Sequence, residues 1–143
     1  MATFTRPNRK LVPMSYAMTV TTKSSFADTV TAVREALDAQ GFGILTEIDI
    51  QATLRSKLDV ETPPQVILGA CRPPLAHRAL EIEPSVGLLL PCNVVVRALD
   101  DDNTLVEALD PAVMVSLTGN DALRPIAEDA SQRLTAALGQ VAG

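Results

Sequence analysis

Apolar and polar residues along the chain follow two periods, one typical of strands and one typical of helices. Residues 15–22 alternate between apolar and polar side chains, as expected for a half-buried strand. From Phe26 to Leu37 the apolar residues instead recur every three or four positions, which indicates an amphipathic helix. Residues 66–71 are nearly all apolar, as in a strand that lies inside a sheet.

Capping residues mark where two of the predicted helices begin and where one of them ends. Ser25, with Asp28 three residues later, forms a capping-box pattern before the first helix. Gly41 follows the last turn of that helix, where a residue in the left-handed conformation is expected. Asp49 is the expected N-cap of a short second helix.

These signals predict an α+β fold, namely a two-layer sandwich with a sheet of about five strands and helices packed on one face. Strands are expected at 15–22, 42–47, 66–71, 88–97 and 104–109. Helices are expected at 25–40, 50–58, 73–83, 110–117 and 122–138. We also expect a polar N-terminal arm over 1–14 and one domain over 15–143. The pattern leaves the order of the strands open.

The predicted strand 88–97 is interrupted by Pro91, which suggests a bulge or an edge position. Cys92 falls on the same predicted face as Leu90 and Val94, with Leu88 above them, and this suggests burial. The opposite face is mixed in character and carries Leu89, Pro91, Asn93, Val95 and Arg97. Because helices are expected on one side only, a second copy of the chain could cover this mixed face, and we predict a homodimer.

Composition and charge argue against several classes of protein. The 143 residues are 47% apolar, which suits a folded core rather than a disordered segment. The net charge is −5, and only Arg6, Arg9 and Lys10 cluster, so the chain lacks the basic face that nucleic-acid binding needs. Aromatic residues make up 3% of the chain, too few for a platform on which bases could stack.

The sequence carries no sign of membrane insertion or export. No stretch approaches the roughly 20 apolar residues of a membrane span, and the N-terminus lacks the apolar core of a signal peptide. We therefore expect a cytoplasmic protein with no membrane partner, whose two cysteines are reduced thiols.

Two segments, 69–77 and 88–93, hold both cysteines and the one histidine of the chain. Cys71 is expected at a strand end just before a helix, where the helix dipole and Arg72 would lower the pKa of the thiol. The candidate ligand-binding residues are Cys71, Arg72, His77, Cys92 and Asn93.

Three interpretations of these residues compete. Cys71, Cys92 and His77 could bind a soft metal ion such as zinc or monovalent copper. Cys71 could instead be a reactive thiol, with His77 as its base or Cys92 as its redox partner. In the third interpretation both cysteines pack in the core. Helical spacing favours the third, because it places His77 opposite the apolar side of its helix. That side is formed by Leu75, Ala76, Ala79, Leu80 and Ile82.

Other polar clusters have simpler structural explanations. Glu47 and Asp49 could be paired carboxylates, but Asp49 already serves as a helix cap. The run Asp100 to Asp102 lacks the ligand spacing of a hand-type calcium loop and is expected to be a solvated turn. The sequence contains no phosphate-binding glycine-rich loop and no Gly-x-Ser-x-Gly motif.

Four segments of the sequence resemble one protein family. They are GFGILTEID (41–49), ILGAC (67–71), AHRAL (76–80) and GLLLPCNV (87–94). Together they look like the family catalogued as domain of unknown function 302, over roughly residues 15–140. The resemblance implies a compact α+β domain, typically bacterial or archaeal and homodimeric, and it implies no established catalytic residue or cofactor.

The resemblance also singles out Arg72. The family pattern often has Asn after the first cysteine, so a ligand at this position is expected to be more anionic in this chain. The leading hypothesis is a homodimeric binding module that holds a small ligand or ion near the helix after Cys71. The alternative is a thiol-dependent enzyme or redox protein that uses Cys71 with Cys92 or His77. A purely structural role is the third hypothesis.

Overall fold

The computed structural model describes residues 16–142, so the predicted arm 1–14 lies outside the described residues. The strands are β1 (Ala17–Thr22), β2 (Gly43–Asp49), β3 (Gln65–Cys71), β4 (Cys92–Ala98) and β5 (Thr104–Leu109). The helices are α1 (Phe26–Ala39), α2 (Ile50–Leu58), α3 (Pro73–Ile82), α4 (Ala112–Thr118) and α5 (Arg124–Ala142). Two 3₁₀ helices, η1 (Pro84–Leu89) and η2 (Asp121–Leu123), complete the described chain.

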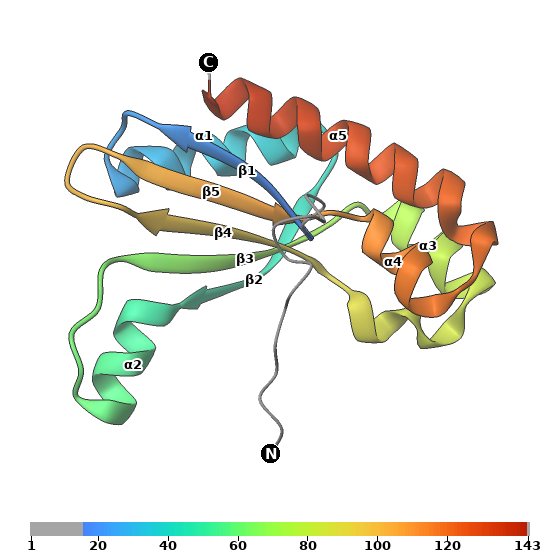
Figure 1. Cartoon of the computed structure of the whole chain (residues 1–143), viewed down its shortest axis with the longest axis horizontal. Helices are drawn as coiled ribbons and strands as arrows, with labels where there is room; N and C mark the ends of the chain where they lie inside the picture. The colour runs from blue at the N-terminus through green and yellow to red at the C-terminus, as the bar shows by residue number, and fades with distance from the viewer. Residues whose placement is uncertain (1–15, 143) are drawn as a thin grey trace, which may run out of the picture.

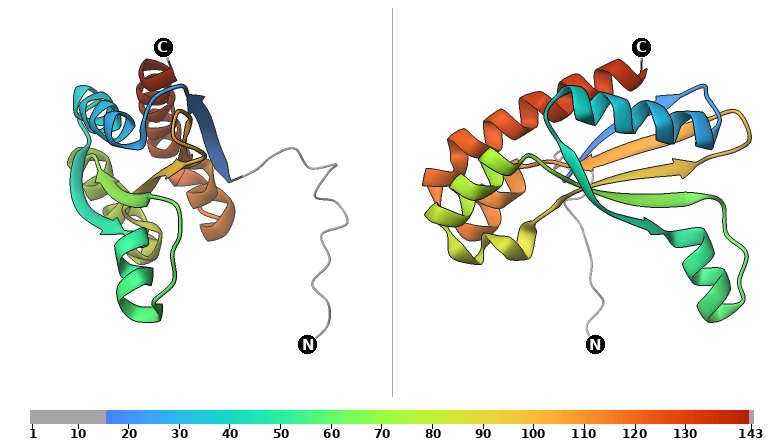
Figure 2. Two further views of the ribbon diagram at one scale, coloured as in Figure 1. Left: turned by 90° about the vertical axis from the view of Figure 1, so that its left-hand side faces the viewer. Right: turned by 180° about the vertical axis from the view of Figure 1, so that it is seen from behind.

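The strands form one antiparallel sheet in the order β1-β5-β4-β3-β2. Helices α1 and α5 lie side by side over the same face of this sheet, while α3 and α4 gather at one end and α2 lies at the other (Figures 1 and 2). The predicted α+β sandwich is therefore confirmed. Within residues 16–142, no helix is both long and apolar enough to cross a bilayer.

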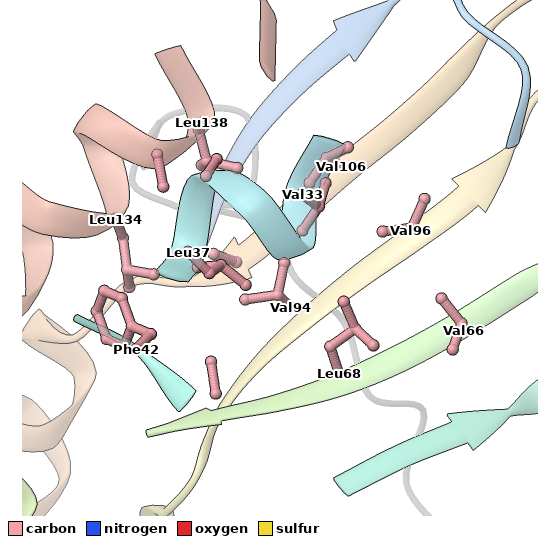
Figure 3. Close-up of a cluster of buried hydrophobic side chains, with 14 residues drawn as sticks. Val33, Leu37, Phe42, Val66, Leu68, Val94, Val96, Val106, Leu134 and Leu138 are labelled. Carbon is pink, nitrogen blue, oxygen red and sulfur yellow. The ribbon is translucent and has the colours of Figure 1, made fainter. Parts of the chain in front are cut away.

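The covered face of the sheet packs against α1 and α5 as one buried cluster (Figure 3). Its labelled members are Val33, Leu37, Phe42, Val66, Leu68, Val94, Val96, Val106, Leu134 and Leu138. Along β3 and β4 these residues alternate with more exposed ones, as the two-residue period of a strand requires. Each buried branched side chain contributes about 1.5–3 kcal/mol through the hydrophobic effect.

A second buried cluster holds α3, η1 and α4 against the first half of α5. Its members are Leu75, Ala79, Val86, Met114, Leu123, Ile126, Ala127 and Ala130. The long helix α5 contributes to both clusters, so it joins α3, η1 and α4 to the sheet.

The predicted caps are confirmed. Ser25 accepts a hydrogen bond from the backbone N–H of Asp28 at 3.2 Å, and Asp49 accepts one from Ala52 at 2.8 Å. Gly41 has a φ of +84°, and the next backbone N–H, that of Phe42, donates to the Leu37 carbonyl at 3.0 Å. This 6→1 bond is the mark of a Schellman motif, which needs a left-handed residue at the position of Gly41.

The prediction of a strand over 88–97 is wrong in its first part. Residues Pro84–Leu89 form η1, and β4 begins only at Cys92, after a cis Leu90–Pro91 peptide bond. Leu88 is 88% exposed, so it does not share a buried face with Cys92. Prolines at both ends of this segment lack the N–H that a strand donates to its neighbour, whereas proline fits the first turn of a helix.

The predicted apolar side of α3 is also narrower than expected. Leu75 and Ala79 are buried, but Leu80 and Ile82 are 40% and 37% exposed. Leu80 comes five residues after Leu75, roughly 140° around the helix from it, and Ile82 is the last residue of the helix.

Gly69 in the middle of β3 allows two neighbouring segments to approach the strand closely. A Cβ atom at this position would lie 2.8 Å from Cγ of Pro91 and would overlap Oγ1 of Thr46. Thr46 on β2 is the register partner of Gly69, so its side chain lies across the space that a larger residue would occupy. The absence of a side chain is therefore a packing requirement here.

We expect Gly69→Ala to lower the free energy of unfolding by about 1–3 kcal/mol, because the added methyl group overpacks this contact. Adding Thr46→Ala should recover part of the loss, since one of the two clashes is then removed. Gly139→Ala is the matched control. A Cβ there meets nothing within 4 Å on the exposed side of α5, so about 0.4–1 kcal/mol of stabilisation is expected. Urea unfolding measures all three variants, and a neutral Gly69→Ala would contradict this account.

Candidate functional site

Three of the five candidate residues line one small cavity. Cys71 ends β3, Arg72 follows it, and Cys92 begins β4, where it is paired in register with Ala70. All three residues line a cavity of about 30 Å³. A space of this size accommodates one group comparable to a water molecule.

The rest of the cavity wall is apolar and comes from distant parts of the chain. It is formed by Phe42, Ala70, Leu75, Ala76, Ala79, Leu90, Met114, Ile126 and Ala130. Apart from Ala76, these residues belong to one of the two buried clusters or pack against one, so the cavity lies where the two clusters meet. Sequence analysis missed the contributions of α4 and α5, because Met114 and Ile126 carry no signal other than their apolar character.

The other two candidate residues lie elsewhere. His77 is on the exposed side of α3, as helical spacing predicts, with its side chain 76% exposed and Nδ1 4.0 Å from Oε1 of Glu81. Asn93 is exposed on the face of the sheet that α1 and α5 leave free. There it borders a shallow depression of about 440 Å³ together with Val95 and Glu107.

Arg72 is the charged group at the cavity, and the glycine that ends α1 makes room for it. A Cβ atom on Gly41 would lie 3.0 Å from Nε of Arg72, so the guanidinium packs directly over this glycine. The Nε atom is buried and has no hydrogen-bond partner among the described residues. Because buried donors are almost always paired, this one is a candidate site for an acceptor beyond the described residues.

The start of α3 offers no free backbone donors to such an acceptor. Its first two residues, Pro73 and Pro74, have no N–H. The next two N–H groups, those of Leu75 and Ala76, both donate to the Arg72 carbonyl at 3.0 Å. The usual anion site of a helix N-terminus is therefore closed, and Arg72 remains as the anion-binding group.

Burial controls the ionisation of both thiols. It raises the pKa of Cys92 to about 11, with a smaller contribution from a charge on nearby Cys71. Burial also raises the pKa of Cys71. The direction is opposite to the lowering expected from the sequence, because the thiol lies against apolar side chains and the helix in front of it has no free N–H groups. Both cysteines are free thiols in the structure.

The acidic residues that the sequence singled out have structural roles. Glu47 forms an ion pair with Arg34 of α1, and Asp49 caps α2. The Asp100 carboxylate accepts the backbone N–H groups of Asp102 and Asn103 at 2.8 Å each, which closes the β4–β5 turn. Over residues 16–142, no group of three or more His, Cys, Asp or Glu side chains is arranged to hold a metal ion.

The pKa of Cys92 predicts a loss of stability in alkali. In the folded chain its thiol stays protonated to about pH 11, whereas in the unfolded chain it ionises near its ordinary value of 9.0. Its contribution is therefore complete below pH 9 and is lost as the pH rises to 11. We expect the wild-type chain to lose about 2–3 kcal/mol more than Cys92→Val over this range. Urea titrations at several pH values measure the difference, and parallel pH profiles would contradict it.

Comparison with known proteins agrees with this fold. The family described as Domain of unknown function DUF302 matches residues 18–141 of the chain. A crystal structure of an uncharacterized conserved protein DUF302 from Bacillus stearothermophilus is similar, with 30% sequence identity and a TM-score of 0.83. The similarity covers 90% of this chain and 99% of that one. No curated protein is significantly similar to the chain. The chain belongs to the DUF302 family.

Proposed function

We propose that this chain is a homodimeric binding module whose site beside Cys71, Arg72 and Cys92 holds an ion-sized anionic ligand. The observation that carries the proposal is Arg72, which lines the cavity and whose buried Nε has no acceptor among the described residues. An anion there would accept this N–H and would face the positive charge of the guanidinium.

The size and chemistry of the cavity support a small anion rather than a metal cation. About 30 Å³ leaves no space for a drug-sized ligand. The two thiols are the metal-ligating side chains that line the cavity, and two are too few for a zinc site. His77, the third ligand of the metal hypothesis, is exposed on the far side of α3.

The pKa values of the two thiols argue against the thiol-dependent enzyme. A reactive cysteine needs a lowered pKa and a base or cation that stabilises the thiolate. Cys71 and Cys92 show the opposite shift, and His77 does not lie at the cavity with them. A cytoplasmic location fits the free thiols and belongs to the same proposal.

The anion hypothesis is tested with Arg72→Met, which keeps the apolar stem and removes the charge. Without added anion, we expect this variant to be as stable as the wild type or more stable, because an unpaired buried donor is lost. Chloride or formate, compared with gluconate at equal ionic strength because gluconate is too large for the cavity, should stabilise only the wild type, by about 2.7 kcal/mol at one hundred times the dissociation constant. Thermal unfolding measures both effects.

Arg78→Met is the matched control, since Arg78 is an exposed arginine on the same helix. It should keep the full response to the anion. A wild-type protein that responds to neither anion, or an Arg72→Met variant that responds equally, would leave the cavity with a packing role only.

The uncovered face of the sheet supports the homodimer. In register, one row across this face reads Thr19, Glu107, Val95, Ile67 and Ile48. Apolar side chains occupy its centre, and no described helix covers them. A second copy placed about a two-fold axis would cover this apolar row with its own row.

Val95→Lys tests the dimer. In a monomer the lysine would lie beside its register partner Glu107, which is a favourable cross-strand pair. At a two-fold interface the same change would bury two additional charges. We expect the wild type to sediment at twice the chain mass of 15.2 kDa and Val95→Lys to sediment as a folded monomer. Leu88→Lys, on exposed η1, should stay dimeric. A wild-type monomer would contradict the proposal.

A further inference from the structure

A second cavity, of about 330 Å³, lies at the opposite end of β3 from Cys71. Its lining residues come from α2, from the segment that joins α2 to β3, and from the ends of β3 and β4; Figure 1 shows where these elements lie. Cys71 lies six positions along β3 from Gln65, a distance of roughly 20 Å in an extended strand. The cavity is therefore distinct from the site beside Arg72, and its volume is in the range of small-molecule sites.

One wall of this cavity contains an unpaired polar atom. The Oγ1 atom of Thr62 is buried and has no hydrogen-bond partner among the described residues. The backbone around it is held in place, since the Thr62 carbonyl accepts a hydrogen bond from Nε2 of Gln51 at 2.9 Å. The backbone of Thr62 is thus fixed beside the cavity, and rotation of its side chain would let the hydroxyl group donate to a bound molecule.

A second wall supplies a positive charge and an amide. Gln65 and Arg97 are register partners on β3 and β4, and both line the cavity. The nearest carboxylate to Arg97 is that of Glu107, at 3.6 Å, too far for a good hydrogen bond. Within residues 16–142, the guanidinium donates no hydrogen bond, so a carboxylate ligand would compete only with the 3.6 Å contact to Glu107.

The remaining wall is apolar, and the nearby charges do not compete for the ligand. Ile50 and Leu54 of α2 face the cavity. Arg55 and Glu61, on the outside of the same segment, satisfy each other with a bond of 2.9 Å between Nη2 and Oε1. The site thus combines a guanidinium with one long ion pair, a threonine hydroxyl without a partner among the described residues, and a short apolar wall.

We propose that this cavity binds a short-chain carboxylic acid. The carboxylate pairs with the guanidinium of Arg97 and accepts a hydrogen bond from the hydroxyl group of Thr62. The hydrocarbon chain packs against Ile50 and Leu54. Arginine suits this role because its planar donors match the two oxygens of a carboxylate. The inference is independent of the proposed anion site at Arg72, since the two cavities share no lining residue.

Hexanoate is a suitable probe, with 1-hexanol as its uncharged counterpart. In a titration followed by backbone amide NMR, hexanoate should shift the signals around Thr62, Gln65 and Arg97, whereas 1-hexanol should bind at least tenfold more weakly. Thr62→Val and Arg97→Met should each raise the dissociation constant for hexanoate tenfold or more, since each removes a hydrogen bond to a charged group. Glu107→Gln should lower it severalfold, because it removes the carboxylate that competes for Arg97.

Two controls keep the result interpretable. Thr62→Val removes a hydroxyl that has no partner, so the unliganded variant should fold with wild-type stability or better. Arg72→Met should leave hexanoate binding unchanged. The inference is overturned if hexanoate causes no localised shifts, if 1-hexanol binds equally well, or if Thr62→Val and Arg97→Met bind like the wild type. Loss of binding in Arg72→Met alone would assign the carboxylate to the other cavity.

Discussion

The packing of α1 and α5 against one face of the sheet determines where every other group in the molecule lies. Along β4 it directs Val94 and Val96 into the core and leaves Val95 and Arg97 on the free face. A slip of one residue in register would exchange these two sets, and the burial of the core cluster opposes it strongly. The position of Cys92 inside, and of Asn93 outside, follows from the same alternation.

Strand β3 connects the two places where this packing leaves polar groups unpaired. Among the described residues, Arg72 Nε and Thr62 Oγ1 are the buried side-chain atoms without a hydrogen-bond partner. Each atom belongs to a residue that lines a cavity, and the two cavities lie at opposite ends of β3. Folded proteins pair nearly all of their buried polar groups, so two exceptions beside two cavities are the strongest functional signal in the structure.

Local chemistry made much of the fold predictable. Ser25, Gly41 and Asp49 act within a few residues of their own position, and all three were identified from the sequence. The error at residues 88–91 arose because a run of leucines reads as a strand, while the prolines that oppose a strand there act on backbone donors. The cavities were harder to predict, since Met114 and Ile126 reach Cys71 only through tertiary packing, and the unpaired atoms of Thr62 and Arg72 are features of the folded chain alone.

Native mass spectrometry of the chain, purified without chelators and exchanged into a volatile buffer, tests the central claim that this domain is a dimer that holds small ligands. The account predicts twice the chain mass of 15.2 kDa together with a small added mass, which is lost from Arg72→Met or from Thr62→Val. A bare single chain would contradict it, since the free face of the sheet would then lack a partner and both unpaired atoms would be without a ligand.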